Sequence, residues 1–136
     1  MNDVAYIALG SNVGDRIAHL SRAQIALAAL PESRIVAASS IEETAPIGPV
    51  AQGAFLNQMV ALETSLSPAD LLRELQIIEQ REGRERTVRW GPRTLDLDIV
   101  RFDRQLVNEP SLQVPHPELH NRDFWQRELA ELGVKT

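Results

Sequence analysis

Two carboxylates separated by one residue, Asp96 and Asp98, are the residues whose types and spacing point most directly to chemistry. On a β-strand, side chains two positions apart project to the same face, about 7 Å apart at their Cα atoms. Both acids can then reach the same hard cations, while Leu97 between them enters the core. The pair suits magnesium, although two solvated acids on the outer face of a strand are the commoner meaning of an isolated Asp-x-Asp pattern.

The segment before this acid pair is rich in arginine. Five arginines, at positions 81, 84, 86, 89 and 93, fall within a stretch that contains only two acids, Glu82 and Glu85. The guanidinium group is a planar fork of donors that suits bidentate capture of phosphate or carboxylate. A bias toward arginine explains why Lys135 is the only lysine, but it does not explain the clustering. Arginines beside carboxylate-held magnesium are the parts that phosphoryl transfer requires.

Three other pairs of residues could contribute to a site. Phe55 and Asn57 are two apart on an expected strand, so a ring and an amide point the same way, although phenylalanine on a strand usually belongs to the core. Gln76 and Glu79 share a helix face, and solvent exposure is the simpler interpretation of both. His116 and Arg122 fall in an expected loop and could be ordinary surface residues.

Composition restricts the class of protein. The 136 residues fit one domain, the net charge is −5, and cysteine is absent. The acidic balance argues against a general nucleic-acid coat. The longest apolar runs are far shorter than the roughly 20 residues that cross a bilayer, and the first residues lack the basic region of a signal peptide. We therefore expect a soluble, cytoplasmic protein that binds neither nucleic acid nor membrane.

The elements that must position these residues follow from periodicity and from the placement of proline and glycine. The order is strand, helix, strand, strand, helix, strand, with two long loops and a loop-rich C-terminal end. This order predicts an α+β fold of the ferredoxin-like βαββαβ type with an antiparallel sheet. The expected strands cover 4–9, 34–40, 55–64, 94–102 and 106–107, the helices run from about 14 to 30 and from 68 to 83, and the loops cover 44–54 and 82–93.

The run from Arg89 to Val100, RWGPRTLDLDIV, resembles the signature of the 6-hydroxymethyl-7,8-dihydropterin pyrophosphokinase family. Four further stretches are similar to that family and occur in its order. They are residues 5–12, residues 44–49 with 55–57, residues 79–86, and residues 114–117 with 121–124. The resemblance covers about residues 4 to 124, and the C-terminal end is shorter than is usual for the family. It implies a single pyrophosphokinase domain over residues 1–136.

The resemblance implies transfer of pyrophosphate from ATP to the hydroxymethyl group of the dihydropterin, with AMP as the other product. Asp96 and Asp98 are then expected to hold two Mg²⁺ ions that bridge the ATP phosphates, with Asp98 also close to the pterin hydroxymethyl group. Arg84 and Arg93 are expected to contact the phosphates in transfer and, with Asp98, to form the catalytic set. The other expected ATP contacts are Gln76, Glu79, Arg86, Trp90, His116 and Arg122.

The resemblance also implies a pterin pocket in which two rings sandwich the heterocycle and polar groups bind its edge. The rings are expected to be those of Phe55 and Phe124. The edge contacts are expected from Asn57, the hydroxyl of Thr44, and backbone groups around Ala45 and Ile47. ATP and the dihydropterin are the expected partners of a monomer.

Two other classes of protein remain as alternatives. A nucleotidyl- or glycosyltransferase shares a Gly-Ser and acid-pair pattern, but here Ser11 and Asp96 are 85 residues apart. A non-catalytic ferredoxin-like module could keep the fold without the activity. The presence of both aspartates together with Arg84 and Arg93 argues against such a module, because a protein without catalysis does not require that set.

Overall fold

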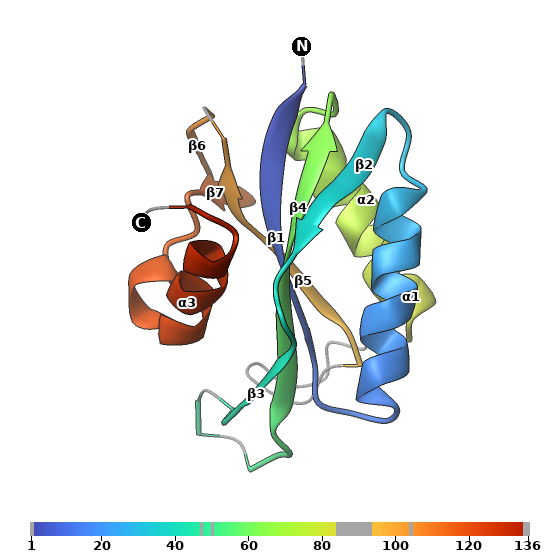
Figure 1. The fold of residues 1–136 in the computed structure, drawn as a ribbon, viewed down its shortest axis with the longest axis vertical. Helices are drawn as coiled ribbons and strands as arrows, with labels where there is room; N and C mark the ends of the chain where they lie inside the picture. The colour runs from blue at the N-terminus through green and yellow to red at the C-terminus, as the bar shows by residue number, and fades with distance from the viewer. Residues whose placement is uncertain (1, 47, 50, 84–93, 104, 135–136) are drawn as a thin grey trace.

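The computed structural model describes residues 2–46, 48–49, 51–83, 94–103 and 105–134. Within these ranges the chain forms a main antiparallel sheet, a small two-stranded sheet and three α-helices (Figure 1). The elements in order are β1 (Asp3–Ser11), α1 (Arg16–Ala28), β2 (Ser33–Ala38), β3 (Glu42–Thr44), β4 (Phe55–Thr64), α2 (Pro68–Arg81), β5 (Asp96–Phe102), β6 (Val107–Glu109), β7 (Leu112–Val114), a 3-10 turn (Leu119–Asn121) and α3 (Asp123–Glu131).

The strand order of the main sheet is β2-β4-β1-β5, and each neighbouring pair is antiparallel. The short strand β3 also pairs with β4, with Thr44 opposite Phe55. Because β1 and β2 both run antiparallel to β4, they are parallel to each other with one strand between them. This is the split-βαβ arrangement, and the predicted ferredoxin-like α+β fold is confirmed.

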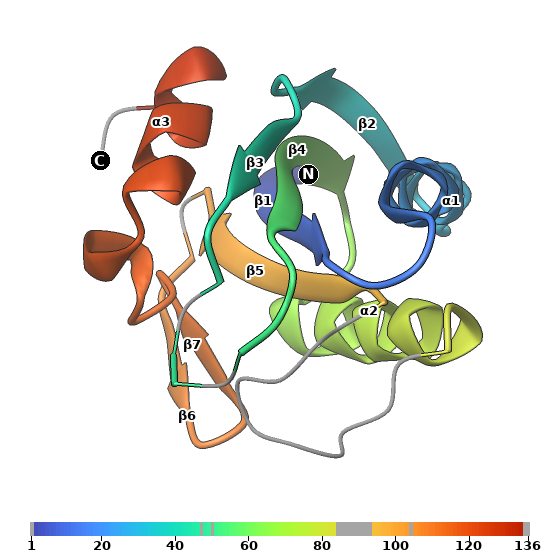
Figure 2. The same ribbon diagram turned by 90° about the horizontal axis from the view of Figure 1, so that it is seen from below.

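The two faces of the sheet are covered by different helices. α1 and α2 lie on one face, and α3 lies on the other (Figures 1 and 2). Leu97 and Ile99 of β5 point toward α1 and α2 and belong to the larger core, whereas Val100 belongs to a smaller core with Trp125 and Leu129 of α3. Burial of a leucine or isoleucine side chain stabilises the fold by about 1.5–3 kcal/mol, so Leu97 and Ile99 must face the larger core. Because side chains of a strand alternate between its faces, the residues between them then face α3.

The starts of the two long helices follow the capping chemistry of the sequence. The side chain of Ser67 accepts a hydrogen bond from the backbone N–H of Asp70 at 3.1 Å, and Pro68 occupies the first helical position. The side chain of Asp15 accepts from the backbone N–H of Ala18 at 3.1 Å at the start of α1. Both interactions satisfy N–H groups that have no partner inside the helix.

Two elements differ from the sequence-based expectation. Residues 42–44 form β3, although residues 42 and 43 were assigned to no element and Thr44 to the start of a loop, because β4 beyond the end of β2 has a free edge that pairs with them. The prediction of a loop-rich C-terminal end is wrong, since residues 123–131 form α3. Its apolar stripe is short, and the buried acid Glu128 interrupts it.

Among the described residues, the helices are too short and too polar for any of them to span a bilayer.

Candidate active site

β5 presents Asp96 and Asp98 on one face of the sheet. Leu97 between them is 5% exposed and lies in the core under α1 and α2, whereas both acids are only partly buried on the opposite face. The predicted strand geometry of the acid pair is therefore confirmed. Carboxylate oxygens are ligands that a hard cation prefers.

The acid pair fits magnesium by its donor chemistry. Mg²⁺ takes hard oxygen ligands and is commonly bound by one or two carboxylates together with substrate phosphates and water. In the ranges that the structure describes, no three histidine or acidic side chains gather as a metal cluster. Two carboxylates thus leave coordination positions for oxygens of a polyphosphate and for water, which suits a metal that arrives with a nucleotide.

A transverse row of residues joins the acid pair to the middle of the sheet. Gly10 of β1 lies opposite Asp96 of β5 on one side and opposite Asn57 of β4 on the other. Residues in register on neighbouring strands point to the same face, so Asn57 and Asp96 share the face that α3 partly covers. Gly10 puts no side chain between them: a Cβ there would lie 3.4 Å from Oδ1 of Asn57 and 3.5 Å from Cδ1 of Phe55, and Asn57 itself is 7% exposed.

The amide of Asn57 has a defined orientation. Its Nδ2 atom donates a hydrogen bond to Oγ1 of Thr44 at 2.5 Å, and its Oδ1 atom is the side that faces Gly10. The ring of Phe55 lies beside it, one position along the same face of β4. The structure therefore brings together three of the residues that were predicted to contact the pterin. Ala45 follows Thr44 directly and is exposed.

His116 approaches the acid pair from the segment after β7. Its Nε2 atom lies 3.7 Å from Oδ1 of Asp98. Its Nδ1 atom accepts a hydrogen bond from the backbone N–H of Glu118 at 3.1 Å, so in the neutral ring the proton is on Nε2 and faces the carboxylate. The backbone N–H of His116 donates to the carbonyl of Val100 at 2.8 Å, which attaches this segment to β5.

Three predicted site residues of the C-terminal segment contact the ring of Trp125 in α3. The His116 and Phe124 rings meet it edge-on, with centroids 4.9 Å and 6.1 Å away. The guanidinium carbon of Arg122 lies 4.3 Å from the centroid of the Trp125 ring, a cation–π contact. The Nε atom of Arg122 is buried and has no hydrogen-bond partner among the described residues. An anion in front of Trp125 would supply one.

Glu79 of α2 is buried, although solvent exposure was the simpler interpretation of its spacing from Gln76. It is 4% exposed, and its Oε2 atom accepts a hydrogen bond from the backbone N–H of Leu97 at 2.8 Å. The interpretation was wrong because β5 is an edge strand and needs an acceptor for this N–H group. Gln76 is exposed, one turn earlier on the helix.

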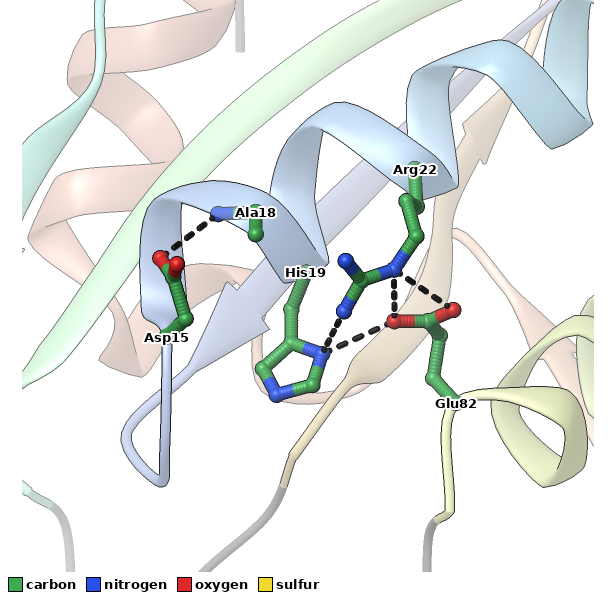
Figure 3. A network of polar contacts seen from close by, with 5 residues as sticks. All are labelled: Asp15, Ala18, His19, Arg22 and Glu82. Carbon is green, nitrogen blue, oxygen red and sulfur yellow. Dashed lines mark hydrogen bonds and ion pairs between the residues drawn. The ribbon is translucent and has the colours of Figure 1, made fainter.

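The C-terminal end of α2 is tied to α1 by a polar network (Figure 3). Glu82 accepts hydrogen bonds from Nδ1 of His19 at 2.8 Å and from Nε of Arg22 at 2.9 Å. Together, the contacts of Glu79 and Glu82 connect the last turn of α2 to β5 on one side and to α1 on the other. The sequence pattern did not single out this network.

Two residues near the start of α1 hold the end of the loop before Phe55. The Nδ2 atom of Asn12 donates to Oε1 of Gln52 at 2.8 Å and to the carbonyl of Gly53 at 2.9 Å. The Nη1 atom of Arg16 donates to the carbonyl of Ala54 at 2.9 Å. Sequence reasoning missed both, and the turn-forming Gly10-Ser11-Asn12 was the only local signal.

Several predicted site residues lie outside the described residues. These are Ile47, Arg84, Arg86, Trp90 and Arg93. Of the others, eight gather on the face of the sheet on which α3 packs: Thr44, Phe55, Asn57, Asp96, Asp98, His116, Arg122 and Phe124.

An antiparallel α+β sheet with an acid pair, an amide with an aromatic neighbour and the guanidinium group of Arg122 on one face has the residue types of a site for a small polar molecule. Comparison with known proteins specifies it further. Residues 6–134 match the family described as 7,8-dihydro-6-hydroxymethylpterin-pyrophosphokinase. The chain belongs to this family.

Individual relatives agree with the family match. A protein of Bacillus subtilis named 2-amino-4-hydroxy-6-hydroxymethyldihydropteridine pyrophosphokinase is 48% identical over 132 residues, which cover 97% of this chain and 79% of the relative. A protein of the same name from Pseudomonas aeruginosa is 47% identical over 128 residues, 94% of this chain and 79% of the relative. The folic acid synthesis protein fol1 of Pneumocystis carinii is 38% identical over 97% of this chain and 18% of its own length.

Proposed function

We propose that this protein transfers the pyrophosphoryl group of ATP to the hydroxymethyl group of 6-hydroxymethyl-7,8-dihydropterin, as a step of folate biosynthesis. The names of the relatives support the reaction, and the observation that carries it to these residues is the row from Asp96 through Gly10 to Asn57. In this row the possible metal ligands and a possible heterocycle contact share one face of the sheet.

The pterin half of the site is the part around Asn57. A pterin presents both donors and acceptors along one edge of a flat ring, and a primary amide can match such an edge with one donor and one acceptor. Because Nδ2 of Asn57 already donates to Thr44, its Oδ1 atom is the group available to a pterin donor. Phe55 and Phe124 supply aromatic surface for the ring from β4 and from the start of α3.

The nucleotide half of the site is the part around Asp96 and Asp98. These acids would hold Mg²⁺ through carboxylate oxygens, and the cation would neutralise charge on the polyphosphate. We expect two ions with bound ATP. Arg122 offers a cation with an unpartnered Nε atom in front of Trp125, and His116 presents Nε2 beside Asp98. Arg84, Arg86, Trp90 and Arg93, with Gln76 and Glu79, complete the proposed ATP contacts.

The proposed reaction is a displacement at the β-phosphorus of ATP. The pterin hydroxyl oxygen forms the new bond to the β-phosphorus, the bond from that phosphorus to the oxygen shared with the α-phosphate breaks, and AMP leaves. The hydroxyl proton is lost in the same process. Asn57 and the two phenylalanines would orient the pterin so that its hydroxymethyl group reaches the face in front of Asp98. Positioning of this kind accounts for much of the rate enhancement in phosphoryl transfer.

One assay tests the proposal. The protein is incubated with ATP, Mg²⁺ and 6-hydroxymethyl-7,8-dihydropterin, and the nucleotide products are separated. We expect AMP that depends on the pterin, disappears when EDTA removes the metal and returns when Mg²⁺ is restored. Formation of ADP would show transfer of the γ-phosphoryl group instead, and no turnover by a folded protein would favour a non-catalytic module; either result would overturn the proposed function.

A further inference from the structure

The transverse row of the site continues beyond Asn57 to a second acidic residue. Glu42 of β3 lies directly opposite Asn57 of β4, just as Gly10 does on the other side. Side chains opposite each other in an antiparallel pair have Cβ atoms about 4.5–5.5 Å apart on the same face. Glu42 is therefore the immediate neighbour of the amide that we assign to the pterin edge.

The C-terminal helix is fastened to β3 and to the residues just before it. The Nη2 atom of Arg127 donates to Oε1 of Glu42 at 3.2 Å. The Oγ atom of Ser40 donates to Oε1 of Glu131 at 2.8 Å, and the backbone N–H of Ser40 donates to the other oxygen of the same carboxylate. These contacts place α3 beside β3, as Figure 2 shows. Since α3 begins at Asp123, the same contacts fix the helix that carries Phe124 beside β3, which pairs with the strand that carries Asn57.

Glu128 lies in the middle of this contact and is buried. It is 3% exposed, and no N–H or hydroxyl donor among the described residues binds either of its carboxyl oxygens. Its carboxyl group interacts with that of Glu42, and the other charged groups that act on it are Arg127 and Glu131. Two ionised carboxylates are both acceptors and repel each other, so this contact is satisfied only when one of them carries a proton. Burial, together with Glu42, raises the pKa of Glu128 to about 9, so Glu128 is the protonated member at neutral pH.

We propose that Glu42 and Glu128 share one proton, and that this carboxyl pair is a positioning device that holds α3 with Phe124 against the strands that carry Thr44 and Asn57. The proposal rests on the proposed function for its effect on the pterin. Glu128 does not touch the substrate. It acts through Glu42 and through the placement of α3, and its loss affects the pterin half of the site more than the nucleotide half.

Simple space-filling by Glu128 is the competing explanation, and two variants separate it from a shared proton. Glu128→Gln keeps the shape and a donor toward Glu42 but cannot ionise. Glu128→Leu keeps much of the volume but has no donor. Glu109→Gln, on the exposed strand β6, is the matched control for removal of an acidic charge.

Steady-state kinetics from pH 7 to 9.5 supply the first readout. We expect the KM for the pterin to rise in the wild type relative to Glu128→Gln as the pH passes the range in which the shared proton is lost. At pH 7, Glu128→Leu should show a several-fold higher KM for the pterin with an unchanged KM for ATP. Ionisation of the pterin itself affects every variant equally, so the comparison is between proteins at the same pH.

Amide hydrogen exchange supplies a second readout that does not depend on activity. In Glu128→Leu, protection of residues 41–44 and 123–131 should fall together, while β5 keeps its protection. Identical pH profiles of wild type and Glu128→Gln, or wild-type exchange in both segments of Glu128→Leu, would overturn the shared-proton device. If the wild type forms no AMP, the proposed function fails, and hydrogen exchange alone then decides whether the carboxyl pair holds α3.

Discussion

Oδ1 of Asp98 lies 3.7 Å from Nε2 of His116, and the His116 ring is held edge-on against Trp125. The backbone N–H of Glu118 donates a hydrogen bond to Nδ1 of the same ring, so the Nε2 side of the imidazole faces the carboxylate. The second acid of the Asp-x-Asp pattern thus lies beside a residue that comes 18 positions later in the chain. This contact joins β5 to the C-terminal part of the site.

Replacement of either acid by alanine should abolish turnover. Asp96→Ala and Asp98→Ala each remove half of the proposed carboxylate set for Mg²⁺, and neither side chain lies in the core, so the unfolding transition should change little. AMP formation and thermal unfolding measure the two effects. Asp103→Ala, an exposed acid just after β5, is the control and should keep full activity. Retained activity in either site variant contradicts the metal assignment.

Replacement of Asn57 by alanine should weaken pterin binding specifically. The loss of polar contacts to the pterin edge, at about 1–3 kcal/mol, corresponds to a 5- to 150-fold increase in the KM for the pterin. The KM for ATP should stay near that of the wild type. Asn108→Ala on β6 removes an exposed amide far from this row and serves as the control. An equal rise in both KM values would mean that Asn57 supports the fold and not the pterin.

Replacement of Glu79 should destabilise the protein. Glu79→Ala leaves the backbone N–H of Leu97 without its carboxylate acceptor, at a cost of about 1–3 kcal/mol in the free energy of unfolding. Glu79→Gln keeps an acceptor oxygen and should lose less. Urea denaturation with Glu109→Ala as the control measures the difference. Coinciding curves for wild type and Glu79→Ala would show that β5 does not depend on this bond.

The network in Figure 3 predicts a loss of stability in acid. Partial burial raises the pKa of Glu82, but hydrogen bonds from His19 and Arg22 outweigh burial and leave the pKa below its usual value of 4.5. A lowered pKa gives stability that is present above pH 4.5 and is lost as the pH falls through the folded-state pKa. Glu82→Gln should therefore be about 1 kcal/mol less stable than the wild type at pH 7.

Denaturation at a series of pH values checks this expectation. The gap between Glu82→Gln and the wild type should close below pH 4.5, where the carboxyl group takes up a proton. A gap that persists unchanged in acid would assign the effect to packing.

Glu128 should give the stability of the fold the opposite dependence on pH, with a loss of stability as the pH rises. Burial, with a further contribution from Glu42, raises the pKa of Glu128 from 4.5 to about 9. Its contribution to stability is complete below pH 4.5 and declines as the pH rises toward 9, because the unfolded chain releases the proton first. The decline is at most about 1.4 kcal/mol per pH unit. Glu128→Gln cannot ionise and should become more stable than the wild type as the pH rises.

Chemical denaturation at pH 5, 7 and 8.5 measures this trend. A constant difference between Glu128→Gln and the wild type over that range would show that Glu128 is already ionised in the folded protein.

The ferredoxin-like order of elements and the face of Asp96 and Asp98 were predictable from local patterns. Alternation in β5, capping at Ser67 and the length of β4 are properties of neighbouring residues, and short-range sterics and burial determine them. α3 was not predictable in this way. Its stripe of buried residues includes Glu128, whose carboxyl group interacts with Glu42 of a distant strand.

The sequence by itself determined which residues could do chemistry, because an acid pair, clustered arginines and a strand amide are readable from type and spacing. Only the tertiary structure decided which of them meet. The register of β5 with β1 and of β1 with β4 aligned Asp96, Gly10 and Asn57, and the fold of the C-terminal segment brought His116 to Asp98. Contacts between residues far apart in the chain depend on strand register and helix packing, which no local pattern specifies.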